Sequence, residues 1–163
     1  MTYRPMKNGA LCKACPRKGQ PFVPPEGRPG AAVVWLGQEP SAQEVKQERP
    51  FVGPTGTRLT HLWEAACELL KVRIPRTSIW ITNGTLCPSV TNGDKEARLA
   101  AKCCRPRLMR ELAACSPKAA ILVMGKWAAF SLFGTERGVG ELHGFHLKLR
   151  QPRGSKTPED LRR

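Results

Sequence analysis

The stretch Ala31-Ala-Val-Val-Trp-Leu36, followed by Gly37, decides the fold. An apolar run of this length between glycines is typical of a buried strand. Two similar runs follow, Ser78-Ile-Trp-Ile-Thr82 and Ala119-Ala-Ile-Leu-Val-Met124. Such runs are favoured in parallel sheets that helices cover on both faces. We therefore expect an α/β fold, a three-layer αβα sandwich with a short central and mostly parallel sheet.

Helical patterns alternate with these strands. The helical segments that we expect cover, in chain order, residues 42–46, 59–70, 95–101, 107–114 and 125–133. Ser41 is placed to cap the first of them. Residues 146–150 are a candidate for a further strand. In a parallel sheet the functional loops follow the carboxyl ends of the strands, here after Leu36, Thr82 and Met124.

Length and charge suggest the organisation and the partner. The 163 residues predict one domain, over residues 1–150, and a basic, flexible tail over 151–163. The chain has 27 Lys and Arg against 13 Asp and Glu, a formal net charge of +14. This excess favours nucleic acid, with a solvated basic surface or an acidic protein partner as the alternatives. No apolar run approaches the roughly 20 residues of a membrane span, and the N-terminus lacks a secretory signal. We expect an intracellular protein, cytoplasmic or nucleoid-associated.

The cysteines predict a metal site. Cys12 and Cys15 form a C-x-x-C pair in a polar loop, Cys87 follows a predicted strand, and Cys103 and Cys104 are expected at the start of a helix. Four thiolates bind zinc or a [4Fe–4S] cluster, and the pattern alone leaves both open. Buried, unreactive thiols are the alternative, which suits Cys67 and Cys115 in their apolar helical stretches.

Several short motifs occur together in one order. They are Cys12-x-x-Cys15, Gly37-Gln-Glu-Pro40, Arg49-Pro-Phe-Val-Gly53, Ile81-Thr-Asn83, Cys87-Pro88, Cys104-Arg-Pro106 and the stretch from Ser116 to Gly125. As an ordered set they resemble the iron–sulfur uracil-DNA glycosylases of the family-four type. The resemblance runs from about Leu11 to Gly134. It implies a DNA-repair enzyme that binds single- or double-stranded DNA and hydrolyses the N-glycosidic bond of uracil.

The resemblance also implies residue roles. Cys12, Cys15, Cys87 and Cys104 would hold a structural [4Fe–4S] cluster, although loop length would also allow Cys103. Phe51 would stack on the flipped uracil, unless it is an ordinary core residue, and Asn83 would bind the uracil edge, unless it is a turn residue. Gln38 would line the pocket, while Glu39 or Glu44 would activate water. The protein would be a monomer when alone, with replication or repair proteins as further partners.

This chain departs from the family pattern in three places. Gln38 stands where the family has a glutamate, and Leu86 stands where it has a lysine. The His-Pro-Ser motif of the family is expected to be missing, and His143 and His146 lie before its place; His61 is expected to be inert. Because an amide cannot act as a general base, activity would depend on Glu39 or Glu44. The alternatives are a catalytically degenerate DNA-binding or complex-assembly module and a zinc-ribbon-like binding protein.

Overall fold

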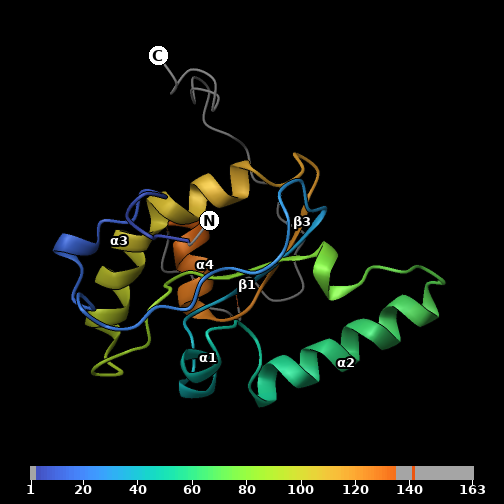
Figure 1. The fold of residues 1–163 in the computed structure, drawn as a ribbon, viewed down its shortest axis with the longest axis horizontal. Helices are drawn as coiled ribbons and strands as arrows, with labels where there is room; N and C mark the ends of the chain where they lie inside the picture. Colours follow the sequence, from blue (N-terminus) through green and yellow to red (C-terminus); the bar gives the residue numbers. More distant parts are fainter. Residues whose placement is uncertain (1–2, 135–140, 142–163) are drawn as a thin grey trace.

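The computed structural model describes residues 3–134 and residue 141. It has a central sheet of three parallel strands in the order β2-β1-β3, formed by Val33–Gly37 (β1), Trp80–Asn83 (β2) and Ala120–Val123 (β3). Helices lie on both sides of this sheet (Figure 1). The predicted αβα sandwich with a parallel sheet is therefore confirmed. The predictions for residues 146–150, for 151–163 and for His143 and His146 lie outside the described residues.

The described helices are two 3₁₀ turns and four α-helices. Their bounds are Cys12–Ala14 (η1), Ala42–Gln47 (α1), Pro54–Leu69 (α2), Arg76–Ser78 (η2), Asp94–Ala113 (α3) and Lys126–Phe133 (α4). Ser41 caps α1 as predicted, because its hydroxyl accepts a hydrogen bond from the Glu44 amide. Among the described helices, none combines the length and the apolar content that crossing a bilayer requires.

The alternation of side chains along β1 builds two cores. Trp35 points to one face and packs with Phe51, Ile79 and Ile81, and residues of α2 close this cluster. Leu36 points to the other face, where α3 and α4 cover it. Gly37 follows on the Trp35 face, so the end of β1 faces the segment that carries Phe51.

The interpretation of residues 95–114 was wrong. The sequence predicts two helical segments with Cys103 and Cys104 at a helix start, whereas α3 runs without interruption from Asp94 to Ala113. Pro106 lies inside it, where a proline removes one backbone hydrogen bond but need not end a helix that packs well. Here α4 packs along α3. Cys103 and Cys104 therefore lie in the middle of α3 and not at a helix start.

The N-terminal arm, residues 3–30, runs from α3 to the outer edge of β2. The Leu11 amide donates to the Cys103 carbonyl oxygen at 2.9 Å, and the Val23 amide donates to Leu86 at 2.8 Å. Glu26 then pairs with Ile81 in an antiparallel bridge. The arm is thus attached through backbone hydrogen bonds to the elements that carry the other candidate cysteine ligands.

Two apolar surfaces are less covered than the sequence pattern suggests. On α2 only Leu59 and Trp63 reach the core, while Leu62 and Leu69 are exposed. Leu122 of β3 is 41% exposed among the described residues. Helical or strand periodicity identifies an apolar stripe, but it does not say whether a neighbouring element covers that stripe.

Candidate active site and cysteine-lined cavity

Two predicted base-binding residues meet at the end of the sheet. Gly37 at the end of β1 pairs with Asn83 at the end of β2. A β-carbon on Gly37 would lie 2.2 Å from Asn83 Oδ1 and 2.8 Å from Phe51 Cζ. Both distances are shorter than side chains tolerate, so the missing side chain at Gly37 is what lets Asn83 and Phe51 converge.

The Asn83 side chain has an unused hydrogen-bond donor. Asn83 is 2% exposed, and its Nδ2 has no hydrogen-bond partner among the described residues. A buried amide without a partner costs free energy, so such a group in a folded protein calls for an explanation. A ligand with a carbonyl acceptor would satisfy it.

Phe51 lies in a tightly packed loop between α1 and α2. It is 9% exposed, and its ring packs against Trp35 with the ring centroids 6.1 Å apart. Its backbone has a φ of 55°, in the left-handed region that residues other than glycine rarely adopt. The Phe51 amide donates a hydrogen bond to Glu44 Oε1. Phe51 is thus both a core residue and a neighbour of Asn83 at Gly37.

Glu44 uses both carboxylate oxygens to organise the backbone. Its Oε2 accepts from the Ser41 amide at 2.6 Å, which completes a capping box, and its Oε1 accepts from Phe51. The side chain is buried. The geometry therefore gives Glu44 a part in fixing the Phe51 loop.

Glu39 differs from Glu44 because its side chain remains 30% exposed. Its Oε2 lies 2.5 Å from Nη2 of Arg17, which comes from the N-terminal arm. Glu39 is thus an ion-paired carboxylate that solvent can reach, at the loop that follows β1. Of the two predicted catalytic acids, Glu39 is therefore the one with the more exposed side chain.

Gln38 faces the start of α4. Its Oε1 accepts from the Trp127 amide at 3.0 Å, and a β-carbon on Gly125 would lie 2.5 Å from the Gln38 side chain. The Gln38 carbonyl oxygen accepts from the Thr85 amide at 2.9 Å. Gln38 therefore joins the loops that follow all three strands.

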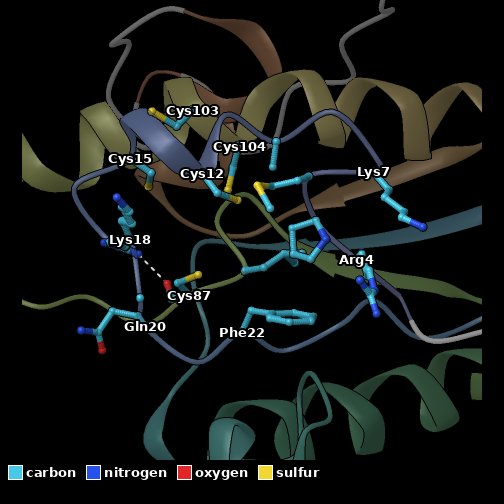
Figure 2. Close-up of a pocket in the computed structure, with 16 residues that line it drawn as sticks. Arg4, Lys7, Cys12, Cys15, Lys18, Gln20, Phe22, Cys87, Cys103 and Cys104 are labelled. Carbon is cyan, nitrogen blue, oxygen red and sulfur yellow. Dashed lines mark hydrogen bonds between the residues drawn. The ribbon is translucent and has the colours of Figure 1, made fainter.

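All five candidate cysteines line one cavity of about 440 Å³ (Figure 2). Figure 2 shows Cys12 and Cys15 on the arm, Cys87 on the loop after β2, and Cys103 and Cys104 on α3. No group of three or more metal-binding side chains closes around one point in residues 3–134 or 141. The arm, the loop after β2 and α3 therefore bring their cysteines to one cavity.

The cavity disfavours separate ionisation of these thiols. Burial, followed by the neighbouring Cys104, raises the pKa of Cys87 to about 12. Burial likewise raises the pKa of Cys12 and of Cys15, with nearby cysteines adding to the effect. Thiolates gathered in this way need a cation to balance them, so the donor set fits a thiolate-bound metal group.

The two adjacent cysteines of α3 differ in exposure and direction. Cys104 is buried and is the cysteine neighbour that raises the pKa of Cys12 and Cys87 most strongly. In Figure 2 the Cys104 side chain lies next to Cys12, whereas Cys103 lies beside η1, and its thiol is within hydrogen-bonding reach of Cys15. Both cysteines line the cavity, and the choice of Cys104 over Cys103 as the fourth ligand stays a prediction.

The other singled-out residues lie apart from these sites. His61 is exposed on α2, Cys67 is half-buried on the same helix, and Cys115 is buried just after α3. Cys115 fits the reading as a buried thiol. The sequence reasoning missed two buried arginines, Arg17 and Arg107, both of which contact the loops of the candidate active site.

Arg107 lies on α3, one turn after Cys104. Its Nη2 donates to the carbonyl oxygens of Asn83 and Gly84 at 2.7 and 2.9 Å, and its Nη1 contacts Thr82 and Glu111 at 3.0 Å. Such contacts join residues far apart in sequence, so no local sequence pattern predicts them. The only available signal is an arginine at helical spacing on the apolar face of α3.

Comparison with known proteins agrees with this geometry. Residues 24–160 match the family model of the uracil DNA glycosylase superfamily. The type-4 uracil-DNA glycosylase of Sulfurisphaera tokodaii is 34% identical over 112 residues, which are 68% of this chain and 47% of the relative. That of Archaeoglobus fulgidus is 32% identical over 118 residues, 71% of this chain and 55% of the relative. The chain spans about half the length of these relatives, and it belongs to the uracil DNA glycosylase superfamily.

Proposed function

We propose that this protein binds DNA and hydrolyses the N-glycosidic bond of uracil, as a base-excision repair enzyme. The observation that carries the proposal is the convergence of Phe51 and the buried, unpartnered amide of Asn83 over Gly37. An enzyme that acts on a base must take it out of the stack and bind it by an aromatic face and by its hydrogen-bonding edge. Type-4 uracil-DNA glycosylases are among the relatives of this chain.

In this proposal Asn83 binds the edge of the flipped base. Its amide offers one donor and one acceptor, and the edge of uracil offers the O4 acceptor and the N3–H donor. Phe51 supplies the apolar face, and the backbone of the Phe51 loop is fixed by Glu44. The partly exposed carboxylate of Glu39 accepts a proton from water, whose oxygen bonds to C1′ as the C1′–N1 bond breaks and uracil leaves with the electron pair.

We further propose that the cysteine-lined cavity holds a [4Fe–4S] cluster through Cys12, Cys15, Cys87 and Cys104. The relatives are type-4 enzymes, and the cysteines from the arm, the loop after β2 and α3 line one cavity of about 440 Å³. A cluster of several atoms suits that arrangement better than a single zinc ion, whose four ligands converge at one point. When bound, the cluster would connect the arm to α3 and to the loop after β2.

A second function has one observation in its favour. Gln38, at the position where the family carries a glutamate, uses its side chain to bind the α4 backbone. A degenerate glycosylase would keep the fold and the positive charge and would bind DNA, or dock on replication or repair proteins, without releasing a base. Binding of this kind would be intracellular, in the cytoplasm or on the nucleoid, and would weaken steeply with salt.

A single-turnover assay tests the first function against the second. The protein, in excess, is incubated with end-labelled single- and double-stranded oligonucleotides that carry one uracil, and abasic sites are cleaved with alkali. We expect cleavage at uracil and none in the matched thymine oligonucleotide. Binding of both oligonucleotides with no abasic product would establish the degenerate module instead.

A further inference from the structure

We infer that Arg17 is a positioning residue, which orients the Glu39 carboxylate and joins it to the cysteine-bearing elements. The inference rests on the proposed function, in which Glu39 activates water. Arg17 follows Cys15 by two residues, yet its side chain extends into the protein and is 2% exposed. It reaches Glu39, Thr85 and the backbone of Cys87 with one guanidinium group.

Contacts other than the one with Glu39 already hold the Arg17 guanidinium in place. Arg17 Nε donates to Glu96 Oε1 at 2.7 Å, and Nη1 donates to the Cys87 carbonyl oxygen at 2.7 Å and to Thr85 Oγ1 at 2.8 Å. A planar guanidinium that is bonded on two sides has no freedom to rotate. The remaining nitrogen, Nη2, is the one that lies 2.5 Å from Glu39.

Glu96 is itself immobile. Besides Arg17, its carboxylate accepts from the Val90 amide at 3.1 Å and from the Thr91 amide and hydroxyl at 2.6 and 2.5 Å. Burial raises the pKa of Glu96, but these hydrogen bonds lower it to about 2, so the group is a permanent anion. Glu96 therefore anchors both Arg17 and the loop that follows Cys87.

The charges show that Glu39 is not needed to neutralise Arg17. Glu96 already supplies one buried carboxylate for the one guanidinium, and its side chain is 9% exposed. Glu39 adds a second carboxylate, and its side chain keeps 30% of its surface open. A surplus carboxylate beside a fixed cation is suited to orienting water, because its position is determined while part of the side chain stays open to solvent.

The same network also fixes the backbone next to Glu39. The Thr85 hydroxyl, which Arg17 contacts, donates to the Gln38 carbonyl oxygen at 3.2 Å, and the Thr85 amide donates to the same oxygen at 2.9 Å. Arg17 thus supports the Gln38–Glu39 loop through the backbone and through the side chain. A change at the cysteine arm would reach Glu39 by this route.

Arg17→Lys tests the inference, with Arg105→Lys as the matched control. Lysine keeps the charge but cannot bond Glu96, Thr85 and Glu39 at once. Arg105 also follows a cysteine and donates to backbone carbonyls, but within residues 3–134 its hydrogen bonds go to Ser131 and Leu132 of α4. We expect Arg17→Lys to lower kcat for uracil release about tenfold or more, because the fixed ion pair with Glu39 is lost, with KM unchanged. Arg105→Lys should leave kcat unchanged.

Amide hydrogen exchange provides a readout that does not depend on activity. In Arg17→Lys the Thr85 amide should exchange about tenfold faster or more, because its acceptor loop loses support, while the Ile81 amide, bonded to Glu26 at 2.8 Å, should not change. Unchanged exchange at Thr85, or an equal increase at both amides, would overturn the positioning role. If the unmodified protein releases no uracil, the proposed function fails while the exchange result still decides the inference.

A milder variant keeps the test valid if Arg17→Lys does not fold. Thr85→Val removes only the hydroxyl that connects Arg17 to the Gln38 carbonyl oxygen and leaves every charge in place. It should reduce kcat and speed exchange at residue 85 in the same direction. Normal kcat and normal exchange in Thr85→Val would contradict the route from Arg17 to the Glu39 loop.

Discussion

Arg107 fixes the backbone of Asn83 from the opposite face of the sheet, by a hydrogen bond of 2.7 Å from its Nη2 to the Asn83 carbonyl oxygen. The Asn83 side chain meets Phe51 on one face, while Arg107 lies among the buried groups under α3 on the other. The strand end that carries Asn83 is thus held by a helix that the Asn83 side chain does not face. Because Arg107 is one turn from Cys104, the same helix serves both sites.

The first prediction concerns this arginine. Arg107→Lys should lower the free energy of unfolding by about 1–3 kcal/mol, because lysine keeps the charge beside Glu111 but cannot also donate to the buried Asn83 and Gly84 carbonyls. Urea unfolding followed by circular dichroism measures the change. Arg110→Lys, on the exposed side of the same helix, should stay within about 0.5 kcal/mol of the unmodified protein. Equal effects of the two variants would show that the buried contacts contribute nothing.

The second prediction concerns the convergence over Gly37. Gly37→Ala should reduce uracil release about 100-fold or more, because its methyl group would displace Asn83 or Phe51 from the positions in which they meet. Single-turnover rates measure the loss. Gly93→Ala adds the same methyl group at the start of α3 and should keep the rate, since its nearest neighbour would be the Thr91 hydroxyl at 3.2 Å. If Gly37→Ala released uracil at the rate of the unmodified protein, the base would have to bind at another site.

The third prediction separates Glu44 from catalysis. Glu44→Gln should destabilise the protein by about 1–2 kcal/mol, because the amide cannot accept from both Ser41 and Phe51 through two carboxylate oxygens. Thermal unfolding measures this effect, and the exposed Glu64→Gln is the control. Full stability with abolished uracil release would instead identify Glu44 as the catalytic acid-base group.

The fourth prediction is a pH dependence that arises from Glu26. Burial raises the pKa of Glu26, but hydrogen bonds from Arg49 and Arg76 outweigh it and lower the pKa below the usual value. The unfolded chain therefore binds a proton at higher pH than the folded protein does. The stability that Glu26 contributes is complete above the usual glutamate pKa of about 4.3 and is lost as the pH falls toward the lower folded pKa.

Urea midpoints between neutral pH and the acid range check this expectation. Glu26→Gln should be less stable than the unmodified protein at neutral pH, and the difference between the two should shrink as the pH falls. A constant difference across that range would mean that the ion pairs of Glu26 with Arg49 and Arg76 contribute no pH-dependent stability.

The fifth prediction concerns the cysteine ligands. Cys104→Ser should abolish iron binding, whereas Cys103→Ser and Cys67→Ser should retain it, because Cys104 points into the cavity beside Cys12. Iron and sulfide analysis of the purified protein, together with its absorbance at about 400 nm, measures the iron–sulfur content. If Cys104→Ser retained iron and Cys103→Ser lost it, Cys103 would be the ligand in place of Cys104. Zinc in place of iron in the unmodified protein would refute the cluster.

Local patterns predicted the elements of this fold correctly where one segment determines its own structure. The apolar runs at Val33–Gly37 and Trp80–Asn83 are strands, and Ser41 caps α1. The interruption expected near Pro106 does not exist, because packing against α4 outweighs one missing backbone hydrogen bond. The helix propensity of a residue determines where a helix ends only when tertiary contacts do not oppose it.

Local sequence patterns likewise predicted some residues of the candidate site and missed others. Phe51, Asn83 and the cysteines could be identified as candidates because each lies in a short recognisable motif. Arg17 and Arg107 were missed because their contacts join residues distant in sequence. The arrangement at Gly37 was missed for another reason: a glycine after a strand is usually a turn residue, and only the structure shows which side chains occupy its empty space.

The attachment of the N-terminal arm has a consequence for biosynthesis. The arm's described backbone bonds to Ile81, Leu86 and Cys103 all join it to segments that the ribosome makes later. During translation Cys12 and Cys15 therefore emerge long before the surfaces on which the arm docks. Loading of the cavity would have to wait until α3 has left the ribosome, and a chain that ends before Cys103 would carry Cys12, Cys15 and Cys87 without the ligand that α3 supplies.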